Sequence, residues 1–477
     1  MTANKAKIVA TLGPASDNYK VMKNMVHAGV NVFRINFSHS SHDAAREIVD
    51  KVRRLNEELD TNIAVLADLQ GPKLRVGTVK EGSHLKVGDV LTFTNTELEG
   101  DSTQVYMTYE KFANDVRPGD RILIDDGKLI LEAIKSNGKD KVEAKVIQGG
   151  PLKSRKGVNL PNTRISLPCL TKKDLADLEV AMECKAEWVA LSFVRNPNDV
   201  YQLRDILQQN NAPCHIISKI EKPEAVVEID EIIDASDGIM VARGDLGVEV
   251  PMQGVPLIQK MIVNKCHLMA KPVVIATQMM ETMIENLTPT RAEVNDVANS
   301  VLDGADAVML SGETSVGKNP VAVIEAMSKI IAHVEESGQV AVKEENPPRY
   351  RNKRFITDSI CYNASKVADQ IGAAAILTMT FSGYTAFKIS AHRPKSNVFM
   401  FTSNRNILNT MSLLWGVRGF FYDKMVSTDE TFDDIKKLVI ESNLVSEGDL
   451  IVKVASMPIH DQGMTNMLKI TSINEPG

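Results

Sequence analysis

Charged and hydroxyl side chains follow several short apolar runs of this 477-residue sequence. Glu221 and Asp245 are hard oxygen ligands of the kind that Mg²⁺ or Mn²⁺ prefers. Arg34, Lys219 and Arg243 are fixed cations that suit a phosphate group or a developing oxyanion. A carboxylate-held metal beside clustered cations is typical of phosphoryl transfer, of chemistry on an enolate, or of both.

The whole set of such residues favours a reaction site over a solvated rim with incidental ion pairs. For a single member the two explanations are equally good, but many runs contribute at the same end. Residues 244–247 (GDLG) add backbone N–H groups at a helix start, a second means of holding an anion. No Ser/His/Asp set appears at these positions, which argues against covalent acyl chemistry. The set comprises Arg34, Asn36, Ser38, Asp68, Ser192, Lys219, Glu221, Arg243, Asp245, Thr277 and Glu313.

The apolar runs that must position these residues are short and β-branched, and a helical pattern follows most of them. Eight such units in series predict an α/β fold, a (β/α)8 TIM barrel, with its active site at the carboxyl ends of the strands. A doubly wound sheet is the alternative, but no GxGxxG follows the first run. The strands are expected at residues 7–13, 30–38, 62–70, 188–194, 215–221, 238–246, 272–279 and 306–312.

A long insertion separates the third and fourth strands. In residues 73–167, apolar and polar residues alternate between glycine-rich turns, which predicts a small antiparallel β domain. Because it leaves from the carboxyl end of the third strand, we expect it to act as a lid over the site.

A polar, proline-bearing stretch at residues 343–355 predicts a linker, after which a separate C-terminal α/β domain begins. The predicted domains are a catalytic barrel of residues 1–72 and 168–343, an inserted lid of residues 73–167, and a C-terminal regulatory or oligomerisation domain of residues 344–477.

Composition narrows the class of protein. Apolar residues form 43% and charged residues 24% of the chain, which is ordinary globular composition with enough apolar material for large cores. The net charge is −6 and no basic run is interleaved with aromatic residues, so nucleic-acid binding is not expected. The absence of a long apolar run argues against a membrane protein, and the five scattered cysteines fit a reducing cytoplasm.

One motif is set aside. Residues 312–320 (GETSVGKNP) nearly match the phosphate-binding pattern GxxxxGK[ST]. Asn319 stands where that pattern has its Mg²⁺-binding hydroxyl, and Pro320 follows at once, so we do not expect a loop of this kind.

Eight segments, taken in order, resemble the motifs of the pyruvate kinase family, closely over about residues 5–335 and more loosely over 355–475. The resemblance implies a barrel with a lid inserted after strand three and a C-terminal regulatory domain. It also implies transfer of the phosphoryl group of phosphoenolpyruvate to ADP, giving ATP and an enolate that is protonated to pyruvate. The segments are RINFSH (34–39), DLQGPKLR (68–75), KGVNLP (156–161), SKIEKPEA (218–225), MVARGDLGVE (240–249), ATQMMETM (276–283), PTRAEVNDVAN (289–299) and LSGETSVGK (310–318).

The resemblance also implies residue roles. Glu221 and Asp245 would hold the divalent ion, Mg²⁺ or Mn²⁺, and Lys219 would stabilise the transferring phosphoryl group and the enolate. Arg34 would grip the phosphate. Thr277 would belong to the protonation path, with a water relay beside it because a threonine hydroxyl is a poor acid. The implied substrate-binding set is Arg34, Lys219, Gly244, Asp245 and Thr277.

On the nucleotide side, the resemblance assigns Arg75, Lys156 and His39 to ADP. Lys156 belongs to the lid, so closure of the lid would complete the site. For His39, orientation of the loop after the second strand is an equally good explanation. The family pattern has Gly where this chain has Ser40, which bears on that loop.

Many members of this family need K⁺, and Asn36, Ser38 and Asp68 match potassium-ligand positions. The family branch with Leu, Gln and Lys at positions 69, 70 and 73 does not need it. We therefore expect K⁺ not to be required, with the Lys73 ammonium replacing it. The alternative is that Lys73 is a surface cation of the lid hinge.

Residues 380–385 (TFSGYT) resemble the effector phosphate loop of the family, with Thr380, Ser382 and Thr385 as hydroxyl donors. Tyr384 stands where that loop often has arginine, so we expect a sugar monophosphate or AMP as effector, in preference to fructose 1,6-bisphosphate. The alternative is a dimerisation domain without a ligand. The family is usually tetrameric, which implies a homotetramer.

Two rival functions remain open at this point. Another barrel that handles phosphoenolpyruvate or an enolate, such as a carboxylase or aldolase, would share the metal and the cations but would not need ADP. A non-catalytic binding protein could keep the fold, but no expected catalytic position is missing here.

Overall fold

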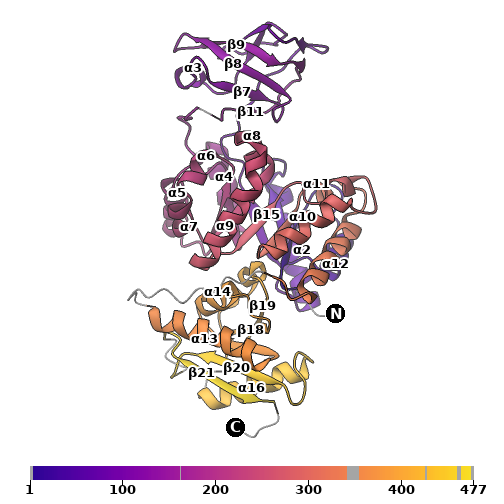
Figure 1. Ribbon diagram of the computed structural model, residues 1–477, viewed down its shortest axis with the longest axis vertical. Helices are drawn as coiled ribbons and strands as arrows, with labels where there is room; N and C mark the ends of the chain where they lie inside the picture. Colours follow the sequence, from indigo (N-terminus) through magenta and orange to yellow (C-terminus); the bar gives the residue numbers. More distant parts are fainter. Residues whose placement is uncertain (1–3, 162, 341–353, 425–426, 459–462, 474–477) are drawn as a thin grey trace.

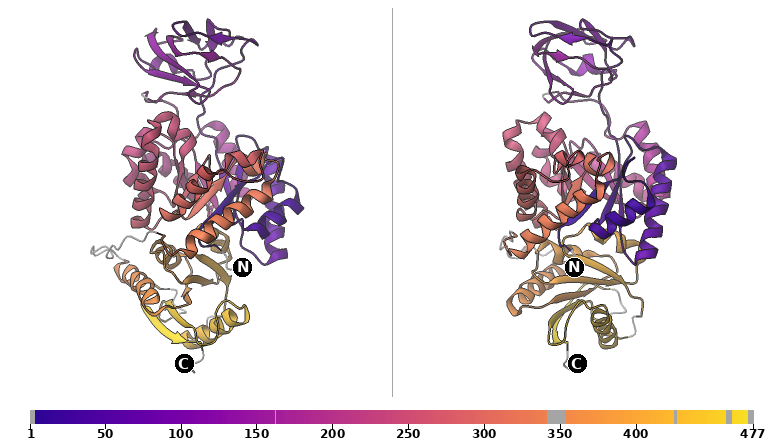
Figure 2. Two further views of the ribbon diagram at one scale, coloured as in Figure 1. Left: turned by 45° about the vertical axis from the view of Figure 1, so that its right-hand side comes forward. Right: turned by 90° about the vertical axis from the view of Figure 1, so that its right-hand side faces the viewer.

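The computed structural model describes residues 4–161, 163–340, 354–424, 427–458 and 463–473. Three parts are stacked along its long axis (Figure 1). A small β domain lies at one end, a barrel in the middle and a C-terminal domain at the other end. The turned views keep this order (Figure 2).

The middle part is a closed barrel of eight parallel strands in the order β1-β16-β15-β14-β13-β12-β3-β2. Each predicted strand is present, which confirms the predicted fold class. The strands end earlier than predicted, most clearly at 238–246, because residues from Arg243 onward are helical. Their bounds are β1 (Lys7–Thr11), β2 (Val32–Asn36), β3 (Ala64–Asp68), β12 (Trp188–Leu191), β13 (His215–Ile220), β14 (Gly238–Ala242), β15 (Val273–Ala276) and β16 (Ala307–Leu310).

Helices surround the barrel, and their starts follow from the sequence. Ser41 accepts a hydrogen bond from the Ala44 N–H, and Thr171 forms a capping box with Asp174. The barrel helices are α1 (Tyr19–Ala28), α2 (His42–Leu59), α4 (Lys172–Glu183), α5 (Pro197–Gln209), α6 (Pro223–Val227), α7 (Ile229–Ala235), α8 (Arg243–Glu249), α9 (Val255–Met269), α10 (Arg291–Leu302), α11 (Gly312–Ser315) and α12 (Pro320–Glu336).

The inserted domain has its own hydrophobic core, separate from that of the barrel. Its main sheet has the order β11-β7-β8-β9-β5-β6 and is antiparallel except for the pair β5–β6, which is parallel and differs from the prediction. Its elements are β4 (His84–Leu85), β5 (Val90–Thr94), β6 (Gln104–Tyr106), α3 (Phe112–Asp115), β7 (Arg121–Ile124), β8 (Leu129–Ser136), β9 (Lys141–Gln148), β10 (Gly150–Pro151) and β11 (Val158–Asn159).

The C-terminal domain is built on a five-stranded sheet of order β19-β18-β17-β20-β21. Four of these strands match the α/β pattern of the sequence, and β21 adds an antiparallel edge that the pattern did not show. The bounds are α13 (Phe355–Ile371), β17 (Ala375–Met379), α14 (Tyr384–Ala391), β18 (Asn397–Thr402), α15 (Arg405–Thr410), β19 (Val417–Phe421), α16 (Thr428–Glu441), β20 (Leu450–Ala455) and β21 (Met467–Ser472).

The C-terminal domain packs against the amino-terminal end of the barrel. Leu413 is fully buried and joins the cluster of side chains that fills the barrel interior, and the Trp188 indole donates to the Thr410 carbonyl at 3.2 Å. Arg393 forms a buried ion pair with Asp306 at 2.7 Å, at the start of β16. These contacts leave the carboxyl end of the barrel facing the lid.

The structure bears only partly on the predicted domain boundaries and on the expected absence of a membrane span. The domain boundaries stay predictions. The boundary at 343/344 and residues 343–353 of the predicted linker lie outside the described residues, and the last residue of that predicted linker, Phe355, already belongs to α13. Within the described ranges, no helix combines the length and the hydropathy needed to cross a lipid bilayer.

Candidate active site

Four charged side chains of alternating sign form a row at the carboxyl end of the barrel. Arg34 donates from Nε to Asp68 Oδ2 at 2.7 Å, and Lys219 Nζ lies 3.2 Å from Asp68 Oδ1. Lys219 Nζ also lies 3.0 Å from Glu221 Oε1. All four were predicted as site residues, and the structure brings them together.

The barrel order explains this contact. β12 lies between β3, which ends at Asp68, and β13, which carries Lys219. Ser192, just after β12, bridges the gap because its hydroxyl accepts from Lys219 Nζ at 2.7 Å and donates to the Leu69 carbonyl at 2.7 Å. On the other side, Asn36 is the strand partner of Asp68.

The row controls the ionisation of its members. Burial opposes the charge of Lys219, but Asp68 and Glu221 outweigh it and raise the pKa of the ammonium. Burial also opposes the charge of Asp68, but Lys219 and Arg34 lower the pKa of this carboxyl. Lys219 therefore stays a cation near neutral pH and acts as a fixed charge rather than as a general base.

Glu221 and Asp245 fit a divalent metal ion. Burial first, against the opposing charge of Lys219, and then the negative charge of Asp245 raise the pKa of Glu221. Such a pair is relieved by a cation. No group of three or more metal-ligating His, Cys, Asp or Glu side chains occurs among the described residues. Two carboxylates with positions left for water and substrate suit Mg²⁺ or Mn²⁺.

Thr277, directly after β15, has a left-handed backbone with φ of 72°, which is unusual for a β-branched residue. Its hydroxyl accepts from the Gly244 N–H at 2.7 Å, and Arg243 donates to its carbonyl at 2.9 Å. Arg243 also forms a fork with Asp296 at 2.6 and 2.7 Å. Arg243 therefore holds Thr277 in place, and the expectation that it is a cation for phosphate is not supported by these contacts.

Two further expectations are corrected at this end of the barrel. Arg243 and Asp245 lie in the first turn of α8, not on a strand as 238–246 was predicted to be. Glu313 is buried in α11 and accepts from the backbone N–H groups of Met280 and Ser311 at 3.1 and 2.7 Å. It ties two loops together and does not join the charged row.

The predicted nucleotide residues are His39, after β2, and Arg75 and Lys156, on the two segments that join the lid to the barrel. Partial burial, followed by the charges of Lys73, Arg75 and Arg34, lowers the pKa of His39. Lys156 forms an ion pair with Asp125 at 2.8 Å, so it does not point freely at the barrel here.

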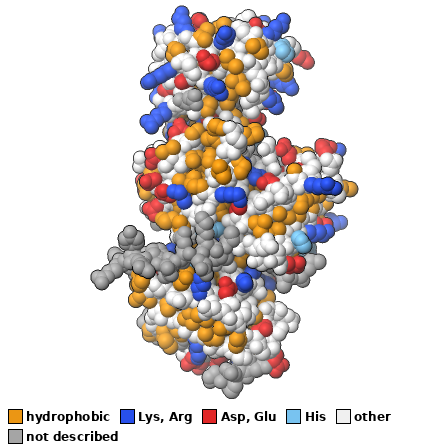
Figure 3. Space-filling view, viewed as in Figure 1, with side chains coloured by type: hydrophobic (Ala, Val, Ile, Leu, Met, Phe, Trp, Pro, Cys, Tyr) orange, Lys and Arg blue, Asp and Glu red, His pale blue; other side chains and the backbone are white. Residues whose placement is uncertain are grey.

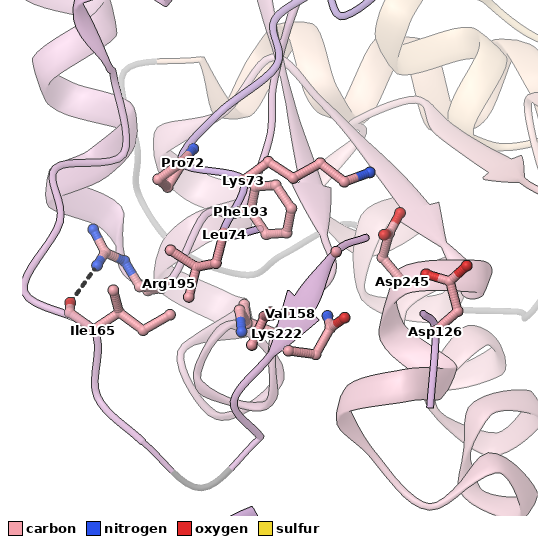
Figure 4. Close-up of a pocket in the computed structure, with 12 residues that line it drawn as sticks. Pro72, Lys73, Leu74, Asp126, Val158, Ile165, Phe193, Arg195, Lys222 and Asp245 are labelled. Atoms are coloured by element: carbon pink, nitrogen blue, oxygen red, sulfur yellow. Dashed lines mark hydrogen bonds between the residues drawn. The ribbon is translucent and has the colours of Figure 1, made fainter. Parts of the chain in front are cut away.

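Lys73 does not approach Asp68 in this structure. Its side chain is exposed, and no ion pair to its ammonium exists within the described ranges. Of the other predicted monovalent-cation residues, Asn36 accepts from the Ser38 N–H at 3.0 Å, and Asp68 is held by Arg34 and Lys219. Lys73 instead lines a pocket at the base of the lid, with Asp245 and Asp126 across it (Figure 4).

Residues that sequence reasoning missed line this pocket or lie beside it, and we call it the hinge pocket. Lys222 and Glu249 form a buried ion pair, and Asn159 of the lid donates to Glu249 at 2.8 Å. Arg195 donates to the carbonyls of Ile165 and Leu167, both at 2.9 Å. Lys222, Glu249 and Asn159 all lie inside motifs quoted above, and opposite charges within buried segments are the signal that could have found the pair.

The predicted effector residues line a separate cavity in the C-terminal domain, of about 280 Å³. Thr380 Oγ1 accepts from the Gly383 N–H at 3.0 Å, and Thr385 is buried against the Thr465 hydroxyl at 2.8 Å. Arg354 also lines the cavity, with its guanidinium 4.1 Å from the centre of the Tyr384 ring. The sequence pattern therefore missed a cation at this cavity, because it lies far from the loop along the chain.

Comparisons with known proteins agree over nearly the whole chain. The family model described as pyruvate kinase, barrel domain, matches residues 3–324, and pyruvate kinase, alpha/beta domain, matches residues 358–471. The chain is 41% identical to a pyruvate kinase of Corynebacterium efficiens, covering 99% of this chain and 98% of the relative. It is 40% identical to one of Mycobacterium tuberculosis, covering 99% of both.

A solved structure supports the same relationship. The crystal structure of a pyruvate kinase from Cryptosporidium parvum superposes with a TM-score of 0.90 at 32% identity, covering 98% of this chain and 96% of that one. Family models, full-length relatives and the arrangement of barrel, lid and C-terminal domain all agree, and the chain therefore belongs to the pyruvate kinase family.

Proposed function

We propose that Arg34, Lys219 and Thr277 carry the reaction at the carboxyl end of the barrel. As a pyruvate kinase, the chain transfers the phosphoryl group of phosphoenolpyruvate to ADP and forms ATP and pyruvate. The observation that supports these residue roles is the row Arg34–Asp68–Lys219–Glu221 beside Asp245.

The row provides the charge that the reaction needs. The enzymes of this family need a divalent metal, and we propose Mg²⁺ or Mn²⁺ on Glu221 and Asp245, where it would neutralise charge on the phosphoryl and enolate oxygens. Arg34 binds the phosphate while Asp68 keeps its guanidinium in place. Lys219, held as a cation, stabilises negative charge as the phosphoryl group leaves.

Protonation of the enolate belongs to the side of Thr277. Its strained backbone places the hydroxyl against the Gly244 N–H. When the substrate carboxylate takes this N–H, the Thr277 hydroxyl is released to orient a water that delivers the proton.

The nucleotide lies on the lid side, where we propose that Arg75, Lys156 and His39 meet ADP. Closure of the lid would exchange the Lys156–Asp125 pair for a contact with the nucleotide phosphates. Many Lys and Arg side chains lie over the lid in the view of Figure 3, and such charges attract anions.

The test is pyruvate formation from phosphoenolpyruvate, ADP and Mg²⁺, first without K⁺ or NH₄⁺ and then with K⁺. We expect full activity without K⁺. Lys219→Met should lower kcat/KM roughly 10²- to 10³-fold. Lys265→Met, which removes a surface lysine paired with Asp230, should not. Pyruvate formed without ADP would point to a carboxylase or aldolase type of barrel.

We propose that the cavity at Thr380, Ser382 and Thr385 binds a phosphorylated effector, a sugar monophosphate or AMP. Arg354 at the cavity supplies the cation that the loop itself lacks. Calorimetric titration of the full chain tests this, with Ser382→Asp as the variant that should abolish binding by charge repulsion. No heat with a sugar monophosphate, AMP or fructose 1,6-bisphosphate would contradict the proposal.

The remaining organisation is proposed on the same basis. Residues 1–72 and 168–343 form the catalytic unit, residues 73–167 the lid, and residues 344–477 a regulatory or oligomerisation unit. We propose that the enzyme is cytoplasmic and that it assembles as a homotetramer. Analytical ultracentrifugation tests the tetrameric assembly directly.

A further inference from the structure

A buried ion pair joins the two segments that carry the proposed metal ligands. Lys222 directly follows Glu221, and Glu249 ends α8, whose first turn carries Asp245. Lys222 Nζ and Glu249 Oε1 are 2.7 Å apart, and each residue is only 5% exposed. The pair therefore fixes the end of β13 against the far end of α8, and with it the spacing of the two carboxylates.

The lid is attached to the same carboxylate. Asn159 belongs to β11, on the segment by which the chain returns from the lid to the barrel, and its Nδ2 donates to Glu249 Oε1 at 2.8 Å. The second oxygen of Glu249 is buried and has no hydrogen-bond partner within the described part of the chain. Oε1 of Glu249 thus accepts hydrogen bonds from both Lys222 and Asn159, so the orientation of the carboxylate depends on both residues.

Asn159 lies next to the hinge between the lid and the barrel. Its neighbour Val158 donates to the carbonyl of Leu74, on the segment that leaves the barrel, at 2.9 Å. The pocket between the two hinge segments is also lined by Lys222 and Asp245 (Figure 4). Any swing of the lid about this hinge must therefore change the contact of Asn159 with Glu249.

We infer that Glu249 is a positioning residue through which the lid and the metal site are coupled by way of Asn159 and Lys222. With the lid as seen here, both donors hold Glu249, α8 is fixed, and Asp245 is aligned with Glu221. The coupling is reciprocal by thermodynamic linkage, so binding of the metal stabilises the Asn159 contact. The inference rests on the proposed assignment of Glu221 and Asp245 as the metal ligands.

The first test measures Mn²⁺ binding to the full chain without substrates, by electron paramagnetic resonance of the free ion. Glu249→Gln keeps the shape but removes the charge, and should weaken Mn²⁺ binding roughly tenfold. Asn159→Ala should weaken it about threefold, the effect of one hydrogen bond. The matched control is Asn114→Ala, an exposed lid residue whose side chain has no hydrogen bond to any described residue, and it should bind Mn²⁺ as the wild type does.

The second test follows hydrogen exchange of the hinge amides Val76 and Val158 with and without Mn²⁺. Mn²⁺ should slow their exchange in the wild type and in Asn114→Ala, and this protection should be lost in Asn159→Ala and Glu249→Gln. A merely structural role of Asn159 would speed exchange equally with and without the metal, and that result overturns the inference.

Other outcomes are equally decisive. Unchanged Mn²⁺ affinity in Asn159→Ala, or an equal loss in Asn114→Ala, also overturns the inference. If Glu249→Gln does not fold, the two measurements on Asn159→Ala still test the inference, because Asn159 is not fully buried. Glu221→Gln distinguishes failure of the coupling inference from failure of the proposed metal site. Unaltered Mn²⁺ binding in that variant would contradict the proposed metal site itself.

Discussion

At the scale of single residues, ionisation in this site is set by neighbours more than by residue type. Lys219 is largely buried, yet its pKa is raised because two carboxylates flank it. His39 is partly buried and near three cations, and the burial together with these charges lowers its pKa. The carboxylates around Lys219 keep its ammonium charged. The surroundings of His39 leave a neutral imidazole whose pKa an incoming anion would raise.

We expect His39 to report on nucleotide binding. Its lowered pKa keeps it neutral at neutral pH, and a polyphosphate placed beside it favours the imidazolium and should raise that pKa. NMR titration of the imidazole signal with and without ADP measures this, with His39→Gln identifying the signal. An unmoved pKa would favour the alternative, a residue that only orients its loop.

Lys73 tests the origin of the expected independence from K⁺. Lys73→Glu removes the cation that we propose replaces K⁺ and adds a carboxylate, so we expect activity to require K⁺. Lys111→Glu, the same change at an exposed lid lysine, should leave the K⁺ response unaltered. Because the Lys73 ammonium is exposed here, its side chain must move toward Asp68 for this role. If Lys73→Glu remains independent of K⁺, Lys73 is a hinge cation only.

At the scale of elements, the site depends on short turns after the strands. Thr277 has a left-handed backbone and is held by hydrogen bonds from Gly244 and Arg243, and Arg243 is in turn held by Asp296 of α10. A Cβ at position 244 would meet the Thr277 hydroxyl at 3.3 Å, so α8 and the turn after β15 fit closely.

Asp296→Asn should loosen this turn. The weaker fork on Arg243 costs about 1–3 kcal/mol of stability, and displacement of Thr277 lowers kcat/KM for phosphoenolpyruvate roughly ten- to hundredfold. Kinetics at varied phosphoenolpyruvate and at varied ADP should show the larger effect on phosphoenolpyruvate. Asp230→Asn, at an exposed surface pair, is the control. Equal effects on both substrates would contradict a local role.

The elements also show what a sequence can predict. Strand positions were predictable because a buried parallel strand reads as an apolar run, and the row from Arg34 to Glu221 followed from strand ends meeting at one edge. The Arg243–Asp296 fork and the Lys222–Glu249 pair were not, because they join segments whose contact depends on side-chain direction. β21 was missed because its alternation is weak at a sheet edge.

At the scale of the whole molecule, the barrel is not an independent unit beneath its neighbours. Leu413 of the C-terminal domain is part of the barrel interior, and Arg393 and Asp306 pair at the junction with both side chains buried. Breaking such contacts exposes apolar surface on both parts, so the two should unfold together.

Leu413→Ala tests this coupling. Loss of a fully buried leucine should cost about 2–5 kcal/mol and lower the unfolding midpoints of the barrel and the C-terminal domain alike. Denaturant unfolding followed by hydrogen exchange in both parts measures it. Leu438→Ala, at a leucine that is 39% exposed on α16, should change stability by less than about 0.5 kcal/mol. Separate transitions would show two independently stable units.

The insertion of the lid after β3 has a consequence for how the chain is made. A ribosome completes the lid, a local unit with its own core, while the barrel still has only three strands. β3 can pair with β12 only after β12 has been synthesised. β1 pairs with β16, which lies about 300 residues later in the chain, as the register of Lys7 with Ala307 shows. During synthesis the growing chain therefore carries a finished lid above an open sheet with two unpaired edges, the state in which chaperones have most to protect.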